Sequence, residues 1–151
     1  PHRFENLGVP ALNEKLQSVQ PELVDLTLAF KPKGDLALNV RGLKVAYVAE
    51  SREIVFENRK RVEGIRKAWR KPQPFRDDGV RRIPAPLVDG RVTLRALVDR
   101  ASLELFVNDG QAAASFVVVP AAGNRTIAIE GNDNLQIDSL VVNELKSIWQ
   151  E

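Results

Sequence analysis

Apolar and polar side chains alternate along most of this chain, which is the pattern of strands that bury one face. In residues 24–30 every second residue, from Val24 to Phe30, is a large apolar one. The same alternation recurs at 36–40, 43–47, 53–57, 92–98, 103–107, 112–119, 126–130 and 135–142. Short strands at this spacing, with little helix between them, predict an all-β sandwich or barrel.

Turn residues separate these segments. Lys31-Pro32-Lys33-Gly34 ends the first strand, and Asn108-Asp109-Gly110 stands between two apolar runs. Asn and Gly tolerate the positive φ angles of tight hairpin turns, so the second signal predicts a hairpin of 103–107 with 112–119. This meander is the firmest structural expectation from the sequence.

Two stretches break the alternation. Residues 1–20 mix proline, glycine and polar residues with a single helical turn at 11–16, and we interpret them as a linker or strap from a missing N-terminal domain, leaving 21–151 as one module. Residues 58–82 are rich in Arg and Lys and contain Pro72 and Pro74, which disfavour a long helix. We expect this second stretch to be a long exposed loop.

Composition narrows the choice of partners. The chain has 151 residues with 22 Lys+Arg against 20 Asp+Glu, a net charge of +2, and the basic loop also contains acidic residues. A solvated loop is therefore favoured over a nucleic-acid-binding surface, and no apolar run is long enough to predict a membrane span. The absence of cysteine excludes disulfides and thiolate metal sites.

Few residues are suited to catalysis or to holding a cofactor. His2 is the single histidine, which argues against a catalytic triad or a histidine-rich metal site, and no glycine-rich phosphate loop follows a strand. Glu104 stands out because it lies within the apolar segment 103–107. An unpaired carboxylate in the core is costly, so we expect Glu104 to face outward, where Arg95 or Arg100 could pair with it.

Two segments resemble a known family. Residues 94–110 read LRALVDRASLELFVNDG, which resembles the LRVLVDRSSVEVFVNDG segment of the C-terminal module of glycoside hydrolase family 32, the family of invertases, levanases and inulinases. Residues 144–149 read ELKSIW and are similar to the family's terminal LKSIW. The Asn-Asp-Pro, Arg-Asp-Pro and Glu-Cys motifs of the family's catalytic propeller are absent from this sequence.

The resemblance implies a concanavalin-like antiparallel β-sandwich of jelly-roll type and a non-catalytic role without cofactors. Similar modules, classed as carbohydrate-binding module family 66, bind terminal fructose of levan-like fructans, and others only brace the five-bladed propeller. Both roles remain open for this chain. The resemblance also implies a secreted fructosidase as the parent protein, with a fructan or fructose and the parent's own propeller as partners.

A fructose site needs carboxylates and guanidinium groups for the sugar hydroxyls and an apolar or aromatic surface for the ring. The matched hairpin supplies Asp99, Arg100 and Glu104, and Arg59, Tyr47 and Trp69 are candidate additions. For Asp99 the alternative is a turn carboxylate that accepts hydrogen bonds from nearby backbone amides.

Overall fold

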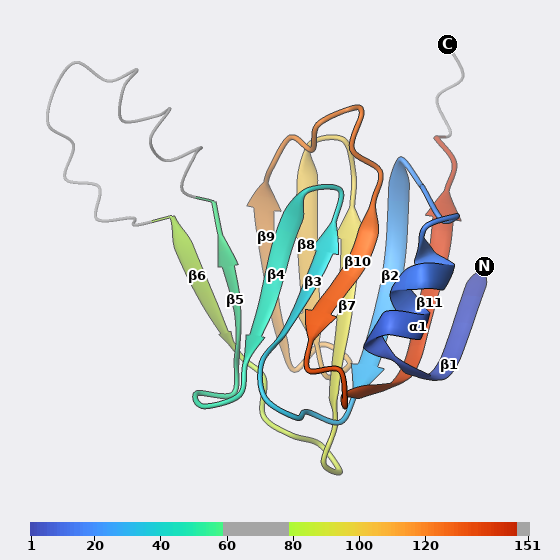
Figure 1. Cartoon of the computed structure of the whole chain (residues 1–151). Coiled ribbons are helices and arrows are strands. Elements are labelled where there is room, and N and C mark those ends of the chain that lie inside the picture. Colours follow the sequence, from blue (N-terminus) through green and yellow to red (C-terminus); the bar gives the residue numbers. More distant parts are fainter. Residues whose placement is uncertain (59–78, 148–151) are drawn as a thin grey trace, which may run out of the picture.

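The computed structural model describes residues 1–58 and 79–147, which form two antiparallel sheets that face each other (Figure 1). In order across the larger sheet, the strands are β1 (His2–Gly8), β11 (Gln136–Leu145), β2 (Leu23–Phe30), β7 (Val92–Val98), β8 (Ser102–Val107) and β9 (Ala112–Val117). In the smaller sheet they are β10 (Ile127–Gly131), β3 (Leu36–Val40), β4 (Leu43–Val48), β5 (Glu53–Glu57) and β6 (Val80–Pro84). The predicted all-β sandwich is confirmed.

The apolar face of each alternating strand fills the space between the sheets. In β7 the buried residues are Val92, Leu94, Ala96 and Val98, and the residues between them point outward. Removing a side chain of this kind from water contributes about 1.5–3 kcal/mol to the free energy of unfolding. The apolar residues of the alternating pattern are therefore the ones whose burial holds the two sheets together.

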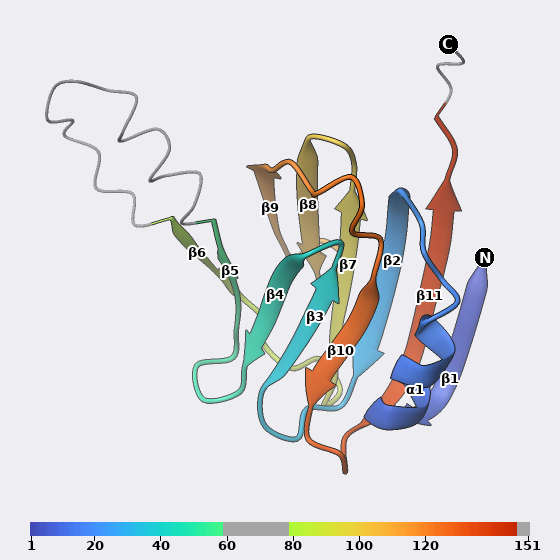
Figure 2. The ribbon, with the colours of Figure 1, turned by 45° about the horizontal axis from the view of Figure 1, so that its top comes forward.

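The N-terminal residues belong to the sandwich. Strand β1 pairs with β11 at the edge of the larger sheet, and α1 (Val9–Leu16) buries Val9, Leu12 and Leu16 in the common core. Helix α1 lies beside β10 and in front of β11, so it extends the layer of the smaller sheet (Figures 1 and 2). The linker or strap predicted for 1–20 missed β1, because an edge strand as polar as HRFENLG lacks the alternation on which the prediction depended. The helical turn expected at 11–16 lies within α1.

The predicted hairpin at Asn108 is confirmed. Asn108 and Asp109 have φ angles of 49° and 57°, and Gly110 follows at 91°. The buried side chain of Asn108 accepts a hydrogen bond from the backbone N–H of Thr93 at 3.1 Å and donates one to the carbonyl of Pro86 at 2.6 Å. These two hydrogen bonds connect the turn to the loop that precedes β7 and to the first residues of β7.

The predicted loop at 58–82 is shorter than expected at its C-terminal end. Residues 80–82 belong to β6, an edge strand in which Pro84 is tolerated because one side of the strand is unpaired. Residues 59–78 lie outside the described part of the chain.

In the described ranges, 1–58 and 79–147, no helix has the length and apolar character that a membrane crossing requires.

Candidate functional site

A pocket of about 380 Å³ lies on the outer face of the larger sheet, beside the turn between β7 and β8. Its lining residues come from β2, the β7–β8 hairpin and the end of β11: Leu23, Leu97, Val98, Asp99, Arg100, Ser102, Glu104, Leu145, Lys146 and Ser147. The pocket combines carboxylates, cations and hydroxyls with three leucine side chains. This mixture is suited to a ligand that has both hydroxyl groups and an apolar face.

Glu104 lies on this outer face, where the strand register places it between Leu97 of β7 and Ser115 of β9. Its carboxylate forms no hydrogen bond or ion pair with any residue that the structure describes. The expected partners are engaged elsewhere, Arg95 with Asp25 and Arg100 with Glu22. The outward orientation of Glu104 is confirmed, and the expected pairing with Arg95 or Arg100 is not formed.

Asp99 behaves as a turn carboxylate at one of its oxygens. Its Oδ1 accepts a hydrogen bond from the backbone N–H of Arg100 at 2.6 Å, and its own N–H donates to the carbonyl of Ser102 at 2.9 Å. In the described residues its Oδ2 has no hydrogen bond or ion pair. Asp99 can therefore hold the turn and still accept a hydrogen bond from a ligand.

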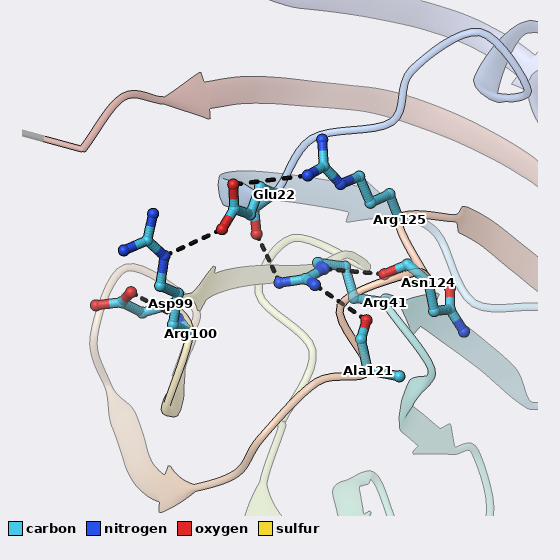
Figure 3. A network of polar contacts seen from close by, with 7 residues as sticks. All are labelled: Glu22, Arg41, Asp99, Arg100, Ala121, Asn124 and Arg125. Atoms are coloured by element: carbon cyan, nitrogen blue, oxygen red, sulfur yellow. Dashed lines mark hydrogen bonds and ion pairs between the residues drawn. The ribbon is translucent and has the colours of Figure 1, made fainter. Parts of the chain in front are cut away.

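The guanidinium group of Arg100 is bound to Glu22 through Nε alone in the described residues. Its Nε donates to Oε1 of Glu22 at 3.0 Å, and the other oxygen of Glu22 lies 3.6 Å from Nη2 of Arg125 (Figure 3). In the described residues the terminal nitrogens of Arg100 have no further partner, and 62% of its side chain is exposed. These nitrogens are free to donate to a ligand.

Of the other candidate residues, Tyr47 lies in the described part of the chain, and it does not line the pocket. Tyr47 is 2% exposed and packs edge-to-face on Phe30, with ring centroids 5.4 Å apart. Phe30 pairs with Val92 at the start of β7, whereas Asp99 follows the end of that strand, so Tyr47 lies at the opposite end of the sandwich. Burial raises the pKa of the Tyr47 hydroxyl, and nearby Arg52 partly opposes this rise. Arg59 and Trp69 lie outside the described residues.

Sequence reasoning missed several residues at the pocket. Lys146 and Ser147 belong to the ELKSIW segment, so the resemblance at the C-terminus was a signal that this segment lies beside the hairpin. Glu22, which holds Arg100, follows Pro21 in a stretch without any motif.

In the ranges 1–58 and 79–147 no group of three or more His, Cys, Asp or Glu side chains could hold a metal ion.

The fold is that of the galectin-like and concanavalin-like β-sandwiches. A galectin of Caenorhabditis elegans superimposes with a TM-score of 0.54 at 18% identity, over 95% of this chain and 90% of the galectin. The sucrose-6-phosphate hydrolase of Lactobacillus gasseri gives a TM-score of 0.63 at 16% identity, over 95% of this chain and 28% of that enzyme. At these identities the likeness establishes the fold alone.

Sequence comparison establishes the family. The model described as "Glycosyl hydrolases family 32 C terminal" matches residues 8–144, so the chain belongs to this family of C-terminal domains. A levanase of Bacillus subtilis (strain 168) is 31% identical over 77 residues, which are 50% of this chain and 11% of the levanase. The chain thus spans about a tenth of the length of that relative. The resemblance stated from the two motifs is confirmed.

Proposed function

We propose that this domain is the non-catalytic C-terminal module of a fructan-active hydrolase and that its pocket binds a terminal fructosyl unit. The observation that carries the proposal is Glu104, an outward carboxylate that faces the pocket beside Arg100 and has no partner in the described residues. A carboxylate in this position accepts hydrogen bonds from sugar hydroxyls, and the guanidinium donates to them. The matched levanase supports a fructan as the polymer.

The apolar part of the pocket supports a sugar ring as well. Leu23, Leu97 and Leu145 line it, and Leu145 is 44% exposed. Sugars present carbon-bound hydrogens on part of their surface, and burying these against leucines adds a favourable hydrophobic contribution. In the described part of the pocket this role falls to aliphatic side chains rather than to an aromatic ring.

The charges of the pocket favour a neutral ligand. The lining contains two carboxylates, Asp99 and Glu104, and two cations, Arg100 and Lys146, and one of these cations, Arg100, is also paired with Glu22. A phosphorylated sugar would meet the unpaired carboxylate of Glu104, and like charges at short range repel. We therefore expect fructose to bind more tightly than fructose 6-phosphate.

Calorimetric titration tests this proposal. Levan and inulin should each give saturable heat with the purified domain, and dextran, a polymer without fructose, should give none. Fructose 6-phosphate should compete more weakly than fructose for the same site. Absence of heat with both fructans, at domain concentrations that detect millimolar binding, would overturn the proposal.

A second role, bracing the parent's propeller domain, is favoured by a different observation. Val117 at the end of β9 is 54% exposed and Val119 is 82% exposed, beside the outer edge of the larger sheet. Exposed valines close together in sequence suit a protein contact better than solvent. Co-expression with the propeller followed by gel filtration tests this role. Co-elution that Val119→Lys abolishes would support it, and separate elution of the wild-type domain would exclude it.

A further inference from the structure

A buried arginine holds together the end of the sandwich that carries the pocket. Arg41, in the turn between β3 and β4, is 3% exposed. Its guanidinium donates three hydrogen bonds to backbone carbonyls, from Nε to Asn124 at 3.0 Å, from Nη1 to Glu22 at 2.8 Å and from Nη2 to Ala121 at 3.1 Å (Figure 3). A buried charge is tolerated only when such bonds replace water, so these three carbonyls are held in place together.

The backbone of Arg41 is fixed as firmly as its side chain. Its N–H donates to the carbonyl of Thr126 at 2.8 Å, and its φ angle of 50° is followed by 78° at Gly42. A Cβ at Gly42 would lie 3.0 Å from Nδ2 of Asn124. The turn, the loop 121–126 and the start of β2 therefore form one connected unit.

Glu22 connects Arg41 to Arg100, which lines the pocket. Arg41 holds its backbone carbonyl, while its side chain extends the other way and accepts the hydrogen bond from Nε of Arg100. Arg125 contacts the second carboxylate oxygen, so the side chain of Glu22 is held at both oxygens (Figure 3). A continuous path of hydrogen bonds and ion pairs thus runs from the interior to the guanidinium that lines the pocket.

We infer that Glu22 and Arg41 are positioning residues of the sugar site, with Glu22 orienting Arg100 and Arg41 orienting Glu22. This inference rests on the proposed function and deepens it, because it assigns how the site is organised before the ligand arrives. With Nε engaged by Glu22, the terminal nitrogens of Arg100 keep a fixed direction. An arginine fixed in this way loses less conformational entropy on binding a sugar, which raises the affinity.

A purely structural role for the Glu22–Arg100 pair is disfavoured by its exposure. The two side chains are 41% and 62% exposed, and ion pairs between exposed side chains add little to stability. Loss of this pair should therefore change ligand affinity while leaving the melting temperature nearly unchanged. That separation distinguishes positioning from folding.

The first test is a double-mutant cycle on fructan binding. Glu22→Ala should weaken levan binding by about three- to tenfold, the range expected when one guanidinium is no longer pre-organised. Glu22→Gln, which keeps an oxygen acceptor for Nε, should restore part of the affinity. In an Arg100→Ala background Glu22→Ala should have no further effect, and an equal loss in both backgrounds would contradict the inference.

The second test needs no ligand and therefore separates this inference from the proposed function. The Nε–H of Arg100 should give a slowly exchanging nitrogen-15 NMR signal in the wild type. That signal should exchange rapidly in Glu22→Ala and in Arg41→Met, and Glu14→Ala on the exposed face of α1 is the matched control. If levan gives no heat, the proposed function fails alone. Rapid exchange of Arg100 in the wild type would overturn the positioning role.

Discussion

Arg95 and Asp25 form a bidentate ion pair on the outer face of the larger sheet, with Nε 2.9 Å from Oδ1 and Nη2 2.8 Å from Oδ2. The hydrogen bond to Asp25 and the charge of that carboxylate raise the pKa of the Arg95 guanidinium. The guanidinium also lies over the ring of Phe106, 5.9 Å from its centroid. This pairing leaves Glu104, two residues before Phe106 on the same strand, without its expected arginine partner.

The Arg95–Asp25 pair should contribute modestly to stability. Because the Arg95 side chain is 49% exposed, solvent screens the pair, and we expect a coupling of about 0.5–1 kcal/mol in an Asp25→Ala and Arg95→Ala double-mutant cycle. Urea denaturation at low and high salt measures it, and the coupling should shrink as salt rises. A coupling that salt leaves unchanged would contradict an electrostatic origin.

Replacing Asn108 should destabilise the hairpin more strongly. Asn108→Ala removes the hydrogen bonds to Thr93 and Pro86 and places alanine at a φ of 49°, so we expect a loss of about 2–3 kcal/mol in the free energy of unfolding. Asn108→Gly removes the same two side-chain hydrogen bonds but tolerates the positive φ, so its loss should be smaller. Equal losses in the two variants, measured by urea denaturation, would show that the positive φ adds nothing to the cost.

Arg41→Met should cost about 3 kcal/mol of unfolding free energy, because three backbone carbonyls lose a charged donor inside the protein. The matched control is Arg3→Met on the exposed edge strand β1, which should change stability by about 0.5 kcal/mol or less. Thermal unfolding of both variants measures the contrast. Similar melting temperatures for the two would contradict the role of the Arg41 hydrogen bonds.

Glu130 should make the stability of the smaller sheet depend on pH. The hydrogen bond from Asn39 and then the contact with Lys44 lower the pKa of its carboxyl group, with donor distances of 2.8 and 3.2 Å. A lowered folded-state pKa gives stability that is present above the ordinary glutamate pKa of about 4.3 and lost as the pH falls through the folded value. Asn39→Ala should raise the pKa of Glu130 in a carboxyl NMR titration. An unchanged pKa would contradict the assigned cause.

The hydrophobic pattern predicted most of the sandwich, and it did so because strands with one buried face record their burial in the sequence. The meander from Val92 to Val117 and its Asn108 turn follow directly from alternation and turn chemistry. Strand β1 was not predicted, since an edge strand needs few apolar residues, and of helix α1 only the turn at 11–16 was expected, because an eight-residue helix carries little periodicity. Such elements are stabilised by contacts with residues distant in sequence, here Ile129 with Asn13.

The candidate site was predictable only in part. The resemblance identified Asp99, Arg100 and Glu104, and the structure brings these three together around one pocket. Tyr47 was proposed for the site only because an aromatic ring suits a sugar. Its side chain belongs to the core because it lies on the inner face of β4. Glu22 could not be inferred, since its role depends on the distance between the start of β2 and the β7–β8 turn, which alternation does not encode.

The most direct measurement is a calorimetric titration of levan into Glu104→Ala beside Glu5→Ala, a matched change on the exposed edge strand of the same sheet. If Glu104 accepts hydrogen bonds from a fructosyl unit, its removal should weaken binding about tenfold or more, which corresponds to about 1.4 kcal/mol, while Glu5→Ala binds as the wild type does. Equal affinities for levan in the wild type and Glu104→Ala would contradict a fructosyl site at this pocket.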